Sequence, residues 1–359
     1  MFSAERLKMA RQRRKLSGKG LADAAGVSPV TVSKVENGHQ PDEATAEKLA
    51  RATGYPLGFF FLDKPETLET KNVSFRSLKK MSAAERDASL AAGMIGIAFY
   101  DWIDQRFHLP QPNLIDLSKE RDRPEIAARL LRQHWGLGDR PVGNTLKLYE
   151  SKGIRILSLT ENTPNVDAYS FWQGNHPYIF LNQRKTAERS IFDSAHELAH
   201  LVLHFHAGRE SAPIVDAEKQ ADRFASAFLM PEADIKSRVG YVYSASQIIK
   251  AKGRWKVSAM ALATRLHGLG MLSDWNYRSI IIELGRRGFR KGEPVGIERE
   301  TSTVLGKVLT ALWKKGVTRK RIADDLLVPS EEIETLIFDL AGKSPARPEG
   351  PDLRVVKQV

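Results

Sequence analysis

The 359-residue chain has the composition of a globular protein with an excess of positive charge. Hydrophobic residues make up 42% and charged residues 27%, which argues against intrinsic disorder. Lys and Arg number 55 against 43 Asp and Glu, which favours acidic partners such as nucleic acid. Cysteine is absent, which excludes disulfides and thiolate metal ligands. No signal peptide is visible and the longest apolar run, 90–100, is shorter than the ~20 residues of a membrane span. We therefore expect a soluble, cytoplasmic protein with no membrane partner.

The first 61 residues predict five short helices separated by tight turns. Ser3 and Ser28 stand at helix N-cap positions, Pro29 at a first helical position, and Gly26 and Gly38 at turns. Two short helices joined by a glycine-containing turn form the helix-turn-helix pattern. Eight basic residues but two acidic ones occur up to residue 35, which suits a surface that contacts phosphates.

The second helix of this pair, residues 29–36, is expected to enter the major groove of double-stranded DNA. Val32 and Val35 should pack inward, leaving the polar face of the helix for base and phosphate contacts. The candidate DNA-binding residues are Lys19, Ser28, Val30, Thr31, Ser33 and Lys34.

The segment resembles the XRE family of helix-turn-helix proteins, of the Cro type. The matching residues are Leu21-Ala22, Gly26-Val27-Ser28, Thr31-Val32-Ser33 and Glu36-Asn37-Gly38. Gly18 departs from the family, which usually has a polar residue there, so the usual phosphate contact is either missing or supplied by Lys19. The resemblance implies an operator as the DNA partner, and paired half-sites imply a homodimer. The alternative is a helical dimerisation module that no longer binds DNA.

Strand and helix patterns follow this segment. Residues 62–121 are expected to be a linker and helical connector, with a short strand at 73–76 and a buried helix at 82–107. Three further strands are expected, at 154–159, 168–172 and 177–182, and they form a small sheet whose edge can bind an extended peptide. The expected fold class is mainly α with a small β-sheet (α+β).

The stretch FDSAHELAHLVLH, residues 192–204, carries the motif H-E-x-x-H. Residues four apart lie on one face of a helix, so His196 and His200 can bind one metal ion. Glu197 lies between them, where it can hold and deprotonate a metal-bound water. Taken alone, the motif also fits two surface histidines on an ordinary amphipathic helix.

A second helix, starting near residue 216, supplies the acidic groups that the motif lacks. Glu218 follows His200 by 18 residues, enough for one loop and a return to the metal as a third ligand. Asp222 lies one turn further, where it can accept the second ring N–H of His196 or His200. This is the two-helix arrangement of gluzincin peptidases.

The stretches LNQRKTAERSIFDSAHELAHLVLH and EKQADRFASAFLMP resemble the ImmA/IrrE metallopeptidase family, fused to an XRE helix-turn-helix. The resemblance implies one Zn²⁺ ion, with Mn²⁺ as an alternative, held by His196, His200 and Glu218 with Glu197 as the base. It also implies cleavage of a repressor protein as the activity. Ala199 stands where the family usually has Gly, and Asp222 where Asn is common; neither change removes a catalytic group.

Other polar residues are weaker candidates for the site. Tyr169, Tyr178 and Arg223 are possible donors to a tetrahedral oxyanion, although strand tyrosines more often simply pack. His204 continues the helical ladder of histidines, and we expect it to have a second-shell or surface role.

The C-terminal third is expected to be helical and basic. Residues 319–336 align with the N-terminal helix-turn-helix at a constant offset, but Glu331, Glu332 and Glu334 would repel phosphates. We therefore expect a packing or partner module there. The expected domains are a helix-turn-helix domain at 1–61, the connector at 62–121, a zinc peptidase domain at 122–236, a helical domain at 237–342 and a disordered tail at 343–359.

Two functions fit these patterns. The first is a DNA-binding transcription regulator that carries a zinc endopeptidase acting on a protein substrate, such as a repressor. The second is a transcription regulator or antitoxin-like DNA binder whose metallopeptidase fold senses a ligand or partner without cutting.

Overall fold

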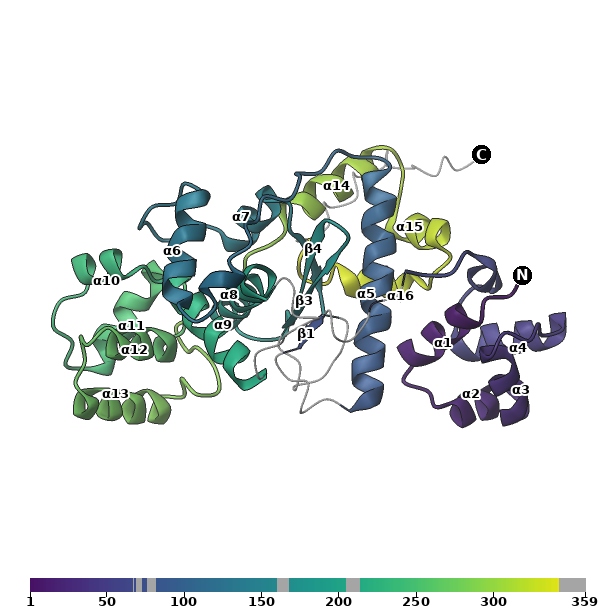
Figure 1. Cartoon of the computed structure of the whole chain (residues 1–359), viewed down its shortest axis with the longest axis horizontal. Coiled ribbons are helices and arrows are strands. Elements are labelled where there is room, and N and C mark those ends of the chain that lie inside the picture. Colours follow the sequence, from purple (N-terminus) through teal and green to yellow (C-terminus); the bar gives the residue numbers. More distant parts are fainter. Residues whose placement is uncertain (67, 69–72, 76–81, 160–167, 205–213, 342–359) are drawn as a thin grey trace, which may run out of the picture.

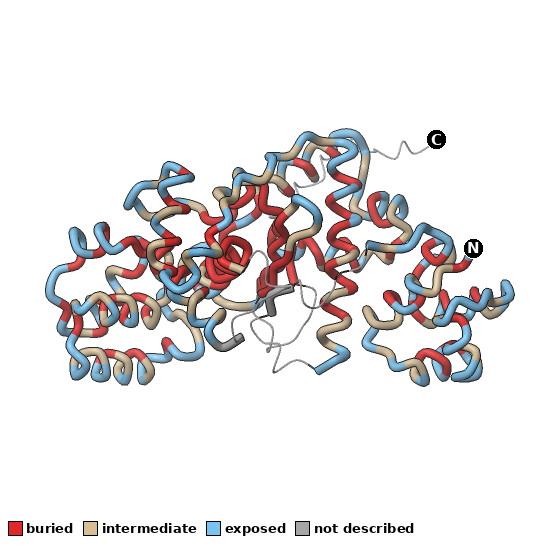
Figure 2. Tube along the Cα trace, viewed as in Figure 1, coloured by how far each residue is buried: buried red, intermediate tan, exposed pale blue. Residues whose placement is uncertain are grey.

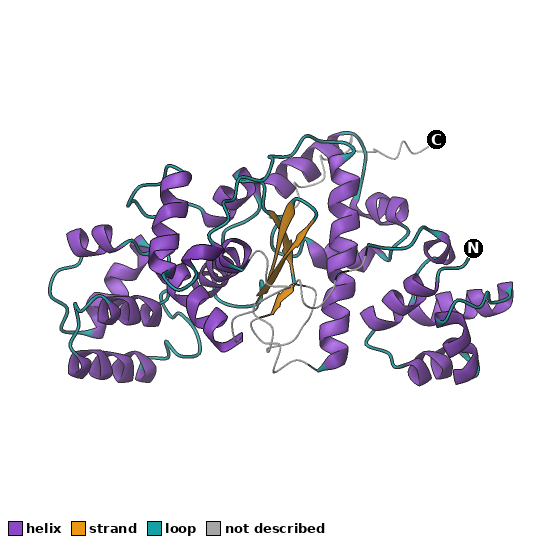
Figure 3. Ribbon diagram, viewed as in Figure 1, coloured by secondary structure: helices purple, strands orange, loops and turns teal. Residues whose placement is uncertain are grey.

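The computed structural model describes residues 1–66, 68, 73–75, 82–159, 168–204 and 214–341. Within these ranges the chain is mainly helical around one four-stranded sheet, which confirms the predicted α+β class (Figure 1, Figure 3). The predicted tail at 343–359 and the last residue of the strand predicted at 73–76 lie outside the described residues. Among the described helices, none is both long enough and apolar enough to span a membrane.

The N-terminal module consists of the predicted short helices. They are α1 (Ala4–Arg13), α2 (Gly18–Ala25), α3 (Pro29–Glu36), α4 (Glu43–Thr53) and the 3₁₀ helix η1 (Leu57–Phe61). Each α-helix begins at a Ser or Asp whose side chain accepts a backbone N–H, which satisfies a donor that the helix itself cannot. Gly26, at φ +62°, makes the turn between α2 and α3. Val32 and Val35 are buried as predicted.

The sheet has the strand order β1-β3-β4-β2. Its strands are β1 (Val73–Phe75), β2 (Arg155–Ser158), β3 (Ala168–Gln173) and β4 (His176–Leu181). β2 and β4 are parallel, whereas β3 pairs antiparallel with both β1 and β4. The segment 62–121, expected to be a linker and helical connector with a short strand, therefore contributes that strand, β1, to the sheet. A short strand is indistinguishable from a linker until its pairing partner is known.

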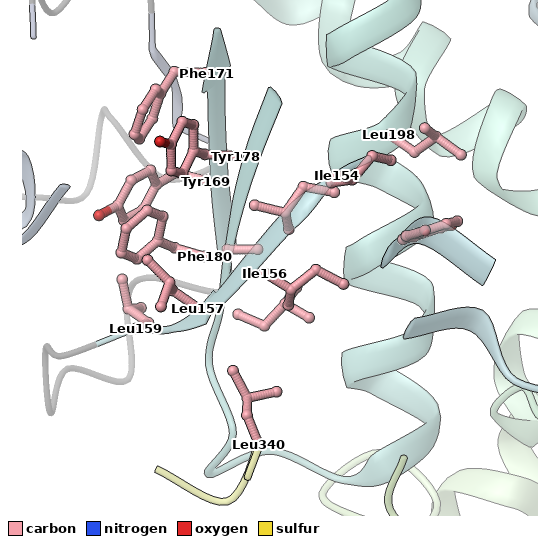
Figure 4. Packing of buried hydrophobic residues seen from close by; sticks show 14 of the residues in the cluster. Ile154, Ile156, Leu157, Leu159, Tyr169, Phe171, Tyr178, Phe180, Leu198 and Leu340 are labelled. Atoms are coloured by element: carbon pink, nitrogen blue, oxygen red, sulfur yellow. The ribbon is translucent and has the colours of Figure 1, made fainter. Parts of the chain in front are cut away.

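Helix α5 (Ala83–Asp104) covers one face of the sheet, and it also comes from the segment expected to be a connector. A Cβ atom at Gly96 would lie 2.6 Å from Leu157 and 2.8 Å from Phe180, so glycine allows α5 to approach the strands closely. Aromatic side chains of β3 and β4 stack on this face (Figure 4). Figure 2 shows that the buried residues concentrate on the strands and on the helices beside them.

The opposite face of the sheet is covered by α8 (Ala187–Leu203), which in turn packs against α9 (Ile214–Leu229). Smaller helices surround this pair. They are the 3₁₀ helix η3 (Ser118–Glu120), α6 (Pro124–His134) and α7 (Thr145–Ser151). Almost every residue of α8 is buried, because the helix lies between the sheet and α9.

The region 237–342 was expected to form one helical domain, but its helices lie in two places (Figure 1). One group continues from α9 at one end of the molecule. It comprises α11 (Ala245–Ala251), the 3₁₀ helix η4 (Lys252–Arg254), α12 (Ala259–Gly268) and α13 (Asp274–Arg286), and it follows α10 (Glu232–Arg238), which begins before residue 237. The other group returns toward α5 and the N-terminal module. It comprises α14 (Thr303–Lys314), α15 (Arg319–Leu326) and α16 (Ser330–Leu336).

Helices α15 and α16 repeat the geometry of α2 and α3. Leu327 adopts the left-handed conformation (φ +53°) 301 positions after Gly26, so both pairs turn at the same place. Glu332 corresponds in this alignment to Thr31, a candidate DNA contact. Only 2% of Glu332 is exposed, and it binds Arg13 at 2.8 Å and the Tyr55 hydroxyl at 3.2 Å. At the position where α3 carries the half-buried Thr31, α16 therefore carries a buried carboxylate that packs against the N-terminal module.

We expect Glu332→Ala to lower the free energy of unfolding by about 3 kcal/mol, because it removes the buried carboxylate that Arg13 and Tyr55 contact. Urea denaturation, followed by circular dichroism, measures the change. Glu331→Ala is the matched control, since Glu331 is exposed on the same helix. Equal stability of the two variants would contradict the role of Glu332 in holding the N-terminal module.

Candidate metal centre

Helix α8 positions two imidazoles on one face. Thr186 caps the start of the helix by accepting the backbone N–H of Arg189, and the helix then runs without a break to Leu203. His196 and His200 lie one turn apart, and 1% of His196 and 8% of His200 is exposed. Their Nε2 atoms are 3.1 Å apart, so both rings point to the same place.

Glu218 of α9 completes this group. Its carboxylate oxygens lie 3.3 Å from Nε2 of His196 and 3.4 Å from Nε2 of His200. Zinc ligands at about 2.0–2.2 Å in tetrahedral geometry are separated from one another by about 3.3–3.6 Å. The three side chains thus match the donor set of a zinc ion, and the two distances from Glu218 match this spacing, while the two Nε2 atoms lie slightly closer together. Within the described part of the chain, no other three His, Asp or Glu side chains meet in this way.

The orientation of His196 is set by Asp222, one turn after Glu218. The Nδ1 atom of His196 lies 2.8 Å from Oδ1 of Asp222. A carboxylate accepts the proton of Nδ1, which leaves the lone pair of Nε2 directed toward Glu218. Of the two histidines that the sequence offered as partners of Asp222, the structure selects His196.

Electrostatics favour neutral imidazoles beside an anionic carboxylate. Burial lowers the pKa of His200 to about 4, so its ring is neutral near pH 7. Burial raises the pKa of Glu218, but its close contacts with the imidazoles of His196 and His200 outweigh burial and hold that pKa well below its usual range. Metal binding needs these protonation states.

Glu197 is completely buried between α8 and the sheet. Its Oε2 accepts a hydrogen bond of 2.7 Å from the Ser170 hydroxyl, whereas Oε1 has no hydrogen-bond partner among the described residues. Burial raises the pKa of Glu197 to about 7, against the lowering effects of His196 and Ser170. Ser170 was missed in the sequence, although it is a small polar residue between the aromatic residues of β3.

The expectation that Tyr169 and Tyr178 donate to an oxyanion is wrong. Successive strand residues point to opposite faces, so Tyr169 must face α5 when Ser170 faces α8. The Tyr169 hydroxyl donates to the carbonyl of Ser89 at 3.0 Å, and the Tyr178 hydroxyl accepts from Arg155. Figure 4 shows both rings on the side of the strands away from Leu198 of α8.

Arg223 was the third expected oxyanion donor. Its Nε and Nη2 atoms donate to the carboxylate of Glu125 of α6, at 2.8 and 2.9 Å. This bidentate ion pair joins α9 to α6 and engages the guanidinium of Arg223 away from the metal centre. The described residues therefore offer none of the three expected donors to the site.

The candidate DNA-binding residues lie mainly on the open side of the N-terminal module. Ser28, Val30, Ser33 and Lys34 are exposed on or before α3, with Val30 63% exposed. Thr31 is half-buried and bonds to the hydroxyl of Ser28. The remaining candidate, Lys19, is exposed on α2.

An ion pair that the sequence did not reveal fixes α3 in this position. Arg11 of α1 donates to Glu36 at 2.6 and 3.0 Å, and it also donates to the carbonyl of Leu16. These bonds hold the C-terminal end of α3 on α1 and leave its first turns open to solvent.

Two family models match the chain. One, described as an IrrE N-terminal-like domain, covers residues 149–267, from α7 into α12, and contains the whole metal cluster. The other, described as a helix-turn-helix, covers residues 7–60, from α1 to η1. No curated protein matches the chain significantly. The predicted fusion is thereby confirmed: the chain combines a helix-turn-helix DNA-binding domain with a metallopeptidase domain, as a DNA-binding regulator with a protease domain does.

Proposed function

We propose that this protein is a cytoplasmic, DNA-binding transcription regulator whose zinc-dependent endopeptidase domain cleaves a repressor-type protein. The observation that carries the proposal is the convergence of His196, His200 and Glu218 beside the buried carboxylate of Glu197. One zinc ion is proposed, with Mn²⁺ as the alternative metal. The operator is proposed to bind a homodimer, because helix-turn-helix modules usually read paired half-sites.

The chain's own residues suit peptide hydrolysis. A zinc ion supplies Lewis acidity toward a peptide carbonyl and toward water. Glu197 takes the proton of the attacking water on Oε1 and delivers it to the leaving amine, while Ser170 holds Oε2. Asp222 keeps His196 in its ligand tautomer throughout. β1 stands at an edge of the sheet, where an extended substrate segment can add as a further strand.

Incubation with the repressor-type regulator encoded beside the protein tests the proposal. Mass spectrometry should detect a defined cut when zinc is present and no cut after chelation. Re-addition of zinc should restore cleavage, because chelation removes the metal without changing the chain. Persistent cleavage in chelator would refute the zinc mechanism.

The second function, sensing without cutting, is favoured by one observation: Tyr169, Tyr178 and Arg223 are all engaged away from the metal site. A sensor needs the metal centre but no oxyanion donor. Stable zinc binding without cleavage of any offered regulator would support this alternative over the peptidase.

For the DNA-binding domain, we expect Lys34→Ala to weaken binding and to lower the slope of log K against log[salt] by about 1, because one phosphate contact is lost. A duplex selected from random sequence for tight binding is the probe, and fluorescence anisotropy at several salt concentrations measures the slope. Lys307→Ala, an exposed lysine on α14, serves as the control and should leave the slope unchanged. The contact is excluded if both variants keep the wild-type slope.

A further inference from the structure

The two histidines of the metal centre differ in what holds their second ring nitrogen. His196 meets a carboxylate directly, but Nδ1 of His200 faces Nδ1 of His204 at 3.0 Å. One of these two nitrogens must donate and the other accept. If His204 donated, His200 would carry its proton on Nε2 and could not bind a metal there.

The remaining contacts of His204 resolve this ambiguity. Its Nε2 lies 3.0 Å from Oε1 of Gln220, and Nε2 of Gln220 lies 3.1 Å from Oδ1 of Asp122. An ionised carboxylate only accepts hydrogen bonds, so the NH₂ end of Gln220 must face Asp122. The carbonyl end of Gln220 then faces His204 and accepts its Nε2–H.

The direction of the last hydrogen bond follows. A neutral imidazole with its proton on Nε2 has a lone pair on Nδ1, so His204 accepts from Nδ1–H of His200. His200 is left with an unprotonated Nε2 beside Glu218, as a metal ligand requires. The chain of bonds therefore has one consistent direction, from His200 outward to Asp122.

We propose that Asp122, acting through Gln220 and His204, selects the tautomer in which His200 can bind the metal. The three are positioning residues, and this inference rests on the proposed metal centre. They come from three different elements: Asp122 precedes α6, Gln220 belongs to α9, and His204 ends α8. Each metal-binding histidine thus has a carboxylate behind it, direct for His196 and relayed for His200.

The test measures zinc affinity of the full-length protein by competition with a chelating dye. Gln220→Met removes the polar link at nearly constant size and should weaken zinc binding about 10- to 100-fold. Gln220→Glu should keep the wild-type affinity, because a carboxylate accepts from His204 by itself. Glu125→Gln is the control: it weakens the ion pair between α6 and α9 but leaves the relay intact, so affinity should not change.

A double variant distinguishes a role of Asp122 in tautomer selection from a role in folding alone. Asp122→Ala should weaken zinc binding in the wild-type background, where Gln220 needs orienting. When Asp122→Ala is combined with Gln220→Glu, zinc affinity should not fall further, because a carboxylate at position 220 accepts in either orientation. Nitrogen NMR of zinc-loaded protein with labelled histidine should show the proton of His200 on Nδ1 and that of His204 on Nε2.

The outcomes separate the two proposals. A wild-type protein that binds no zinc would overturn the metal centre itself, and the relay with it. Zinc binding that is strong in the wild type and unchanged by Gln220→Met would overturn the relay alone. An equal loss in Gln220→Met and Gln220→Glu would also overturn it, because it would show dependence on the shape of Gln220 and not on an acceptor.

Discussion

Replacement of Glu197 by glutamine should lower the rate of peptide cleavage by about 10²- to 10⁴-fold and leave zinc bound. Glutamine has the same shape but cannot take a proton from water. Its side chain can still accept from Ser170 through the amide oxygen, so the site should keep its structure. The cleavage rate is measured on a peptide that spans the cut, and the zinc content is measured by atomic spectroscopy.

Two comparisons make this result specific. Ser170→Ala removes the anchor of Oε2 but leaves the carboxylate, so its reduction in rate should be smaller than that of Glu197→Gln. Adding zinc should not rescue Glu197→Gln, because the variant lacks a base and not a metal. Cleavage by Glu197→Gln at the wild-type rate would refute the role of Glu197 as the base.

Replacement of Glu218 by alanine should weaken zinc binding by at least about 100-fold. Mutating a residue that only hydrogen-bonds to a metal ligand can already lower metal affinity by about 10- to 100-fold. Glu218 is the one ligand from α9, so without it the metal contacts α8 alone. Zinc at about 100 times its dissociation constant stabilises the folded wild-type protein by about 2.7 kcal/mol. Glu218→Ala should lose most of this zinc-dependent stabilisation.

The measurement is the shift of the thermal midpoint on adding zinc, for wild type and variant. Asp216→Ala provides a matched control, because Asp216 is an exposed acidic residue in the first turn of the same helix. DNA binding by Glu218→Ala should persist, since the helix-turn-helix module lies at the far end of the molecule (Figure 1). An undiminished zinc shift in Glu218→Ala would remove Glu218 from the ligand set.

Much of this protein is determined by patterns a few residues long. The helix-turn-helix helices follow from caps, turns and spacing within about ten residues, and the structure contains them where expected. The pairing of His196 with His200 follows from the pitch of a single helix. Even Glu218 and Asp222 could be placed, because one loop and one helix face limit where they can lie.

The tertiary structure decided every feature that depends on contacts distant in sequence. The pairing of β1 with β3 turned an expected connector into part of the sheet, and the register of β3 turned Tyr169 away from the site and Ser170 toward Glu197. Glu332 meets Arg13 across 319 residues, and Asp122 meets Gln220 across 98. No local propensity encodes such contacts, because they arise only when separate hydrophobic faces have packed into one core. The sequence alone therefore predicted the candidate metal ligands and the helix proposed to read DNA, whereas packing determined which neighbours orient them.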